Sequence, residues 1–153
     1  MIRMDTVVNG TRFVGEVEAN VWLLDFLRDE LGLTGTKRSC DVQVCGSCTV
    51  LVDGRPVSSC TFLAHEVDGA VVETIEGIRE SDFYQDAESA FVRHAAVQCG
   101  FCTPGLVMTL KAIVEDGEGA DEAQLRRSLS GNLCRCTGYR SILDAAAEIV
   151  RES

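Results

Sequence analysis

Eight cysteines in two groups constrain this chain of 153 residues more than any other feature. The first group has the spacing C-x4-C-x2-C, followed by eleven residues and a fourth cysteine: Cys40, Cys45, Cys48 and Cys60. The second group is C-x2-C, then thirty-one residues, then C-x-C: Cys99, Cys102, Cys134 and Cys136. Each group has four sulfurs and no cysteine is left over. This favours two sites with four thiolate ligands each.

Such a set of cysteines could form disulfides, zinc sites or iron–sulfur clusters. Disulfides need an oxidising compartment, and the sequence begins without the apolar stretch of a secretory signal, so we expect a cytoplasmic protein. The first group begins with the plant-type ferredoxin spacing, in which four thiolates bind a [2Fe–2S] cluster. Structural zinc sites normally use two close pairs of ligands, whereas Cys60 stands alone. The second group alone would also suit zinc, but beside a ferredoxin-type group we expect a second cluster.

Charge and composition argue against several classes of partner. The chain has 14 basic and 24 acidic residues, a net charge of −10. Binding to nucleic acid or to an anionic membrane surface depends on Lys and Arg, so neither is expected. Apolar residues make up 46% of the chain, which suits a globular fold. No apolar run approaches the roughly 18–20 residues of a membrane-spanning helix, so we predict no membrane span.

The first half of the chain has the pattern of a small α+β unit over residues 1–76. Strands are expected over 2–8, 11–18, 49–53, 55–59 and 70–75, with a loop over 37–48. Asn9-Gly10 between the first two strands is a strong signal for a hairpin turn, because both turn positions need a positive φ. Asn20 is expected to cap an amphipathic helix that continues to about Leu31.

The second half, residues 77–153, is predicted to be all-α. An acidic and polar segment over 76–86 is expected to connect the two halves. Pro104 suits the first turn of a helix, and Asp121-x-x-Gln124 resembles a capping box. The expected helices lie over about 86–97, 104–114, 121–129 and 142–151, with a loop over 115–120.

Three strings around the cysteines carry a resemblance to a known family: residues 45–50 (CGSCTV), 98–105 (QCGFCTPG) and 134–139 (CRCTGY). In this order they are similar to the small [2Fe–2S] iron–sulfur subunit of the molybdenum hydroxylases. This is the family of xanthine dehydrogenase, aldehyde oxidoreductase and aerobic carbon monoxide dehydrogenase. The resemblance covers nearly the whole chain. It implies an N-terminal β-grasp, plant-type ferredoxin-like domain and a C-terminal all-α four-helix [2Fe–2S] domain.

The resemblance also implies cofactors and partners. Electrons would pass one at a time from a molybdopterin-type molybdenum cofactor in a large subunit, through both clusters, to FAD in a medium subunit. The cluster on the second group would lie nearer the molybdenum, with Gln98 and Cys136 approaching the pterin. The unit would be a heterotrimer or a dimer of heterotrimers. The chain would belong to an enzyme only as its iron–sulfur subunit, because substrate chemistry takes place in another chain and no catalytic residue is expected here.

Other interpretations remain open at this point. The acidic charge would also suit a free-standing two-cluster ferredoxin-type carrier, and a zinc-stabilised interaction module is a third possibility. His65 and His94 are expected to be surface or helix-packing residues rather than ligands, because each group already has four cysteines. The loop of the first group has Gln43 and Val44 where the family has more glycine. We expect a variant loop that keeps its cluster.

Overall fold

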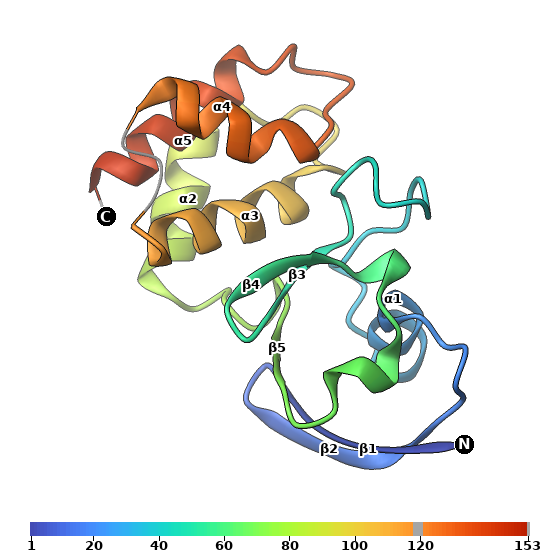
Figure 1. The fold of residues 1–153 in the computed structure, drawn as a ribbon. Helices are drawn as coiled ribbons and strands as arrows, with labels where there is room; N and C mark the ends of the chain where they lie inside the picture. Colours follow the sequence, from blue (N-terminus) through green and yellow to red (C-terminus); the bar gives the residue numbers. More distant parts are fainter. Residues whose placement is uncertain (118–120, 153) are drawn as a thin grey trace.

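The computed structural model describes residues 1–117 and 121–152 (Figure 1). Its elements are β1 (Ile2–Val8), β2 (Thr11–Val17), α1 (Leu23–Asp25), the π-helical turn η1 (Phe26–Glu30), β3 (Thr49–Val52), β4 (Arg55–Ser58), the 3-10 turns η2 (Ser59–Thr61) and η3 (Ala64–Val67), β5 (Val71–Glu73), α2 (Asp82–Arg93), α3 (Thr103–Glu115), α4 (Glu122–Ser128), the 3-10 turn η4 (Leu129–Gly131) and α5 (Arg140–Glu152). Strands fill the first half and helices the second, which confirms the predicted α+β fold. Of the loop expected over 115–120, residues 118–120 lie outside the described residues.

The first half is a mixed sheet with the strand order β2-β1-β5-β3-β4. β1 and β2 form an antiparallel hairpin whose turn residues Asn9 and Gly10 have φ of 51° and 77°, as predicted. β5 is parallel to β1 and antiparallel to β3. Phe26, from the segment after β2, packs into a common core with Met4 of β1 and Val72 of β5. The helical segment therefore covers one face of the sheet.

The helix predicted from Asn20 begins later than expected, and Asn20 does not cap it. Trp22 instead forms an isolated β-bridge with Leu63 and has extended dihedrals, φ −74° and ψ 147°. Because a residue in an extended bridge cannot also be helical, α1 starts only at Leu23. The rest of the predicted helix is the π-helical turn η1.

α2 starts earlier than the sequence pattern predicted. Ser81 caps it, accepting a hydrogen bond at its side chain from the Tyr84 N–H at 3.2 Å. The acidic segment over 76–86 is therefore helical in its second part. The helix ends at Arg93, because Ala95 has a φ of 51° and leaves the helical region.

α3 lies between the sheet and the other helices and is packed against α2, α5 and the sheet strand β3 (Figure 1). Leu106 and Leu110 of α3 are wholly buried, and Leu51 of β3 belongs to the same core. α4 has the predicted cap, with the Gln124 N–H donating to Asp121 Oδ1 at 2.7 Å. Within the described ranges, none of the helices has both the length and the apolarity that crossing a bilayer requires.

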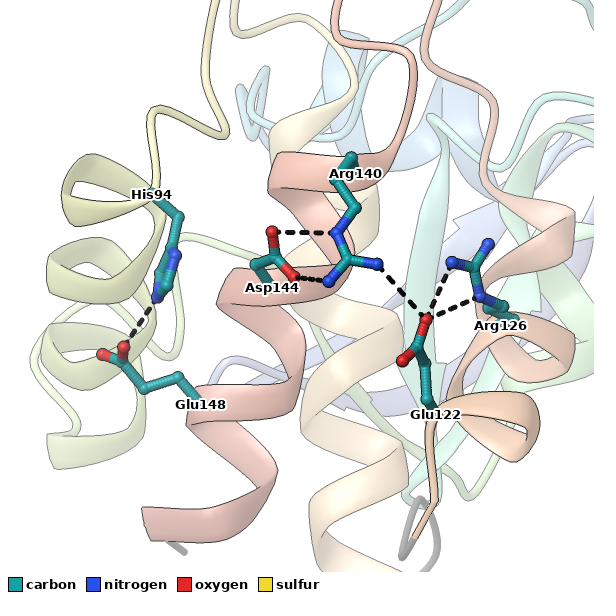
Figure 2. A network of polar contacts seen from close by, with 6 residues as sticks. All are labelled: His94, Glu122, Arg126, Arg140, Asp144 and Glu148. Atoms are coloured by element: carbon teal, nitrogen blue, oxygen red, sulfur yellow. Dashed lines mark hydrogen bonds and ion pairs between the residues drawn. The ribbon is translucent and has the colours of Figure 1, made fainter.

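Ion pairs fasten the outer helices to one another (Figure 2). His94, at the end of α2, lies with Nε2 2.7 Å from Glu148 Oε2 on α5. Arg140 on α5 pairs with Asp144 at 2.8 Å and with Glu122 of α4 at 3.6 Å. His94 thus has the packing role expected of it, in a contact between helices.

Candidate metal centres

The structure pairs the cysteines of the first group two by two, Cys40 with Cys45 and Cys48 with Cys60. All eight cysteines of the chain are free. Cys48 and Cys60 are buried together against Leu24 and hydrogen-bond to each other. Cys40 and Cys45 are half-buried, and their side chains also hydrogen-bond. The four sulfurs of this group are thus arranged as two contacting pairs.

Backbone N–H groups surround the sulfur of Cys40. The backbone N–H groups of Val42, Val44 and Cys45 lower the pKa of Cys40 from 9.0 to about 6. Those of Val44 and Cys45 each lie 3.4 Å from its Sγ. Asp41 and Gln43 have φ of 56° and 57°, which turns successive N–H groups inward. A thiolate held by backbone donors is the form that binds a metal.

Burial acts in the opposite direction on Cys48. Burial first, and the neighbouring Cys60 side chain second, raise the pKa of Cys48 to about 11. A bound cation would offset this cost, because coordination deprotonates a thiol outright. The buried pair is therefore chemically suited to a metal rather than to free thiolates.

The bulky residues of the first group's loop lie on its outer side. The side chains of Val42 and Val44 lie on the surface, with residue exposures of 64% and 56%. Gln43 accepts a hydrogen bond at Oε1 from Thr61 Oγ1 at 3.2 Å, next to Cys60. The loop therefore accommodates larger residues by pointing them outward or along the sheet edge.

The second group is assembled from two loops around the start of α3. Cys102 occupies the position just before α3 without a capping hydrogen bond from its side chain, and Cys134 and Cys136 precede α5. Cys99 and Cys136 have their sulfurs 3.6 Å apart at the surface, and Cys102 hydrogen-bonds to Cys134. This group too is arranged as two contacting sulfur pairs.

Thr137 supplies a donor that the sequence interpretation missed. Its Oγ1 donates to Cys134 Sγ at 3.1 Å and accepts from the Tyr139 N–H at 3.3 Å. Burial raises the pKa of Cys134, but Thr137 and the backbone N–H of Cys136 outweigh it, so the net shift is downward. Burial and the Cys134 side chain raise the pKa of Cys102 to about 12. Thr137 lies inside the CRCTGY string, so a hydroxyl close to Cys134 in sequence was the signal that could have identified this donor.

Gln98 and Cys136 lie together at the exposed end of the second group. Gln98 Nε2 donates to the Cys136 carbonyl at 3.2 Å. Phe101, next to this contact in sequence, is 44% exposed. The side chain proposed from the resemblance to approach a pterin is thus fixed beside an exposed cysteine.

The donor sets fit two-iron clusters. A [2Fe–2S] cluster takes four thiolates, two on each iron, and each group offers its sulfurs as two contacting pairs. The fit rests on the sulfur pairs and on the hydrogen-bond donors directed at Cys40 and Cys134.

Known proteins match both halves of the chain. A family described as "2Fe-2S iron-sulfur cluster binding domain" matches residues 6–73, and one described as "[2Fe-2S] binding domain" matches 74–147. The 6-hydroxypseudooxynicotine dehydrogenase complex subunit beta of Paenarthrobacter nicotinovorans is 44% identical over 147 residues, covering 95% of this chain and 92% of that protein. The xanthine dehydrogenase iron-sulfur-binding subunit of Escherichia coli O157:H7 is 38% identical over 149 residues, covering 96% and 93%.

Solved structures agree with these relatives. Quinoline 2-oxidoreductase from Pseudomonas putida 86 superimposes with a TM-score of 0.90 at 41% identity, covering 98% of this chain and 94% of that one. Aldehyde oxidoreductase from Desulfovibrio gigas gives 0.91 at 36% identity, covering 98% of this chain but 17% of that one. The chain therefore belongs to the family of small [2Fe–2S] iron–sulfur subunits of molybdenum hydroxylases, the electron-transfer components of oxidoreductases.

Proposed function

We propose that this chain relays electrons, one at a time, from a molybdopterin-type cofactor in a large subunit to FAD in a medium subunit. The observation that carries the proposal is the pairing of free thiols within each of two sequence groups of four cysteines, one group in each half of the chain. A free-standing carrier would use the same clusters. The fixed contact of Gln98 with the exposed Cys136 favours a dedicated partner surface instead.

Each half would hold one cluster, in domains that we place at residues 1–76 and 77–153. The first group of cysteines would bind the cluster of the first domain, and the second group that of the second. Sulfurs that touch would share an iron: Cys40 with Cys45, Cys48 with Cys60, Cys99 with Cys136, and Cys102 with Cys134. When bound, each cluster supplies a site that accepts and releases a single electron.

The chain's own residues would stabilise the negative charge at each site. The backbone N–H groups of Val44 and Cys45 would stay directed at Cys40, and the hydroxyl of Thr137 at Cys134. α3 begins immediately after Cys102, so the positive end of this thirteen-residue helix would face the second cluster. These donors are already in place, so little reorganisation would accompany a change of charge.

The exposed residues suggest how the relay is oriented. Cys99 and Cys136 are exposed at the second group, and we place the pterin on that side with Gln98. On the first group, Val42 and Val44 are exposed beside Cys40, and we place the flavin subunit there. The electron would then cross from the second domain to the first.

The assembly would be a heterotrimer or a dimer of heterotrimers, supported by relatives named as subunits of dehydrogenase complexes. A cytoplasmic location is also proposed, because eight free thiols suit a reducing compartment. The test is a gentle purification from the native host, with mass spectrometry of co-purifying chains and assays for molybdenum, FAD and iron. Two stoichiometric partners with molybdenum and FAD are expected. A stable, lone, iron-containing chain free of molybdenum would favour the independent carrier.

A further inference from the structure

The two cysteine groups are fastened to each other by two consecutive hydrogen bonds. Leu133, which precedes Cys134, donates its backbone N–H to the carbonyl of Cys45 at 2.8 Å. The side-chain amide of Asn132 donates to the carbonyl of Gly46 at 3.1 Å. Neighbouring residues of one loop thus bind neighbouring carbonyls of the other, although 86 positions separate Asn132 from Gly46 in sequence.

The first of these bonds completes a direct connection between ligands of the two groups. Covalent bonds lead from the sulfur of Cys45 to its carbonyl, and from the N–H of Leu133 through the next peptide to Cys134. A single hydrogen bond joins the two segments. Electron tunnelling falls steeply with the length of a gap and is favoured along bonds. A residue that keeps this hydrogen bond short therefore preserves the route for electron tunnelling between Cys45 and Cys134.

We propose that Asn132 is the positioning residue that holds this connection, an inference that rests on the proposed function because it requires both clusters. In the step concerned, one electron leaves the cluster held by the second group, which is oxidised, and enters the cluster held by the first, which is reduced. No bond is made or broken and no proton moves. Asn132 acts by locking the Gly46 carbonyl, and with it the adjoining Cys45 carbonyl.

Burial and close packing give this contact its rigidity. Asn132 is 4% exposed, so its amide cannot exchange the bond for one to bulk water. Its backbone N–H donates to the Leu129 carbonyl at 3.0 Å, which fixes it to the end of η4. Gly46 has a φ of 68°, and a Cβ there would lie 2.6 Å from Asn132 Nδ2. On the other side, a Cβ at Gly105 would collide with the Gly46 carbonyl oxygen.

The glycines offer a matched pair of variants. Gly105→Ala would force the Gly46 carbonyl to leave its present position, because a Cβ at Gly105 would collide with its oxygen, without touching a cysteine. Gly131→Ala, next to Asn132, is the control, because a Cβ there meets no atom within 4 Å and its φ is not positive. Asn132→Asp is the direct test. It keeps the size of the side chain but removes the N–H donor facing the Gly46 carbonyl.

The experiment uses the full chain with both clusters bound. The readouts are iron content, the protection factor of the Leu133 amide in hydrogen exchange, and the magnetic interaction between the two reduced clusters by electron paramagnetic resonance. Asn132→Asp and Gly105→Ala are expected to keep both clusters and to lower Leu133 protection by about fivefold, the equivalent of one net hydrogen bond. They should also weaken the magnetic interaction, while Gly131→Ala matches the parent chain.

The outcomes separate this inference from the proposed function. Unchanged Leu133 protection and unchanged magnetic interaction in Asn132→Asp and Gly105→Ala, with both clusters present, would overturn the role of Asn132 alone. Loss of the first cluster from both variants would also overturn it, because the clamp would then serve cluster binding rather than the spacing of the clusters. A parent chain without two [2Fe–2S] signals would instead refute the proposed function.

Discussion

Replacing Thr137 by valine should make the second cluster harder to reduce and leave the first unchanged. The hydroxyl of Thr137 donates to Cys134 Sγ at 3.1 Å, and valine has nearly the same shape without the donor. A hydrogen bond to a charged acceptor contributes about 1.5–3 kcal/mol. Reduction adds one electron that is spread over the whole cluster, so only part of this energy, on the order of 0.5–1 kcal/mol, should differ between the two states.

For a one-electron couple, a tenfold change in equilibrium is 59 mV, so this difference corresponds to a fall of roughly 20–40 mV in reduction potential. The assay is a redox titration of the loaded chain, following the two [2Fe–2S] signals separately by electron paramagnetic resonance. Thr137→Ser is the control, because it keeps the hydroxyl and should keep the parental potential. A potential that rises or stays the same in Thr137→Val, or an equal shift of both signals, would refute the assignment of this donor to the second cluster.

Three further changes test the account at other points. Cys136→Ser should perturb the second signal and spare the first, and equal damage to both would contradict the division into two groups. Glu148 has a pKa below 4.5, held down mainly by the hydrogen bond with His94, so its stabilising contact is present above pH 4.5 and is lost as the pH falls through the lowered pKa. The urea midpoint of Glu148→Gln should therefore lie below that of the parent at neutral pH and converge with it in acid. A difference between the two urea midpoints that grows as the pH falls would contradict this prediction. Lys111→Met should cost about 1–2 kcal/mol in urea unfolding, because the buried ammonium bonds to the one-third-exposed Glu73 of β5 at 3.1 Å. A loss below about 0.5 kcal/mol would mean that solvent screens the pair completely.

Local signals predicted the turns and several helix ends. Asn9-Gly10 has the two positive φ values that its turn type needs, and Asp121 caps α4 as its spacing to Gln124 indicated. These features depend on interactions within a few residues, which a sequence displays directly. The spacing divided the cysteines into two groups, and the sulfur pairs in the structure all lie within these groups.

Features that depend on distant partners were not predictable. Asn20 is a good capping residue, but the bridge between Trp22 and Leu63 keeps the preceding chain extended. Asn132 precedes the second group's last two cysteines in sequence, yet its contact is with Gly46 in the other half. Ser81 is a different case, since its capping signal was local and was obscured by the acidic composition around it.

The central claim is that this chain holds two [2Fe–2S] clusters on eight cysteines. The most direct measurement combines iron, sulfide and zinc analysis of the purified chain with electron paramagnetic resonance after dithionite reduction. About four irons per chain and two distinguishable [2Fe–2S] signals are expected. Stoichiometric zinc without such signals would contradict this claim.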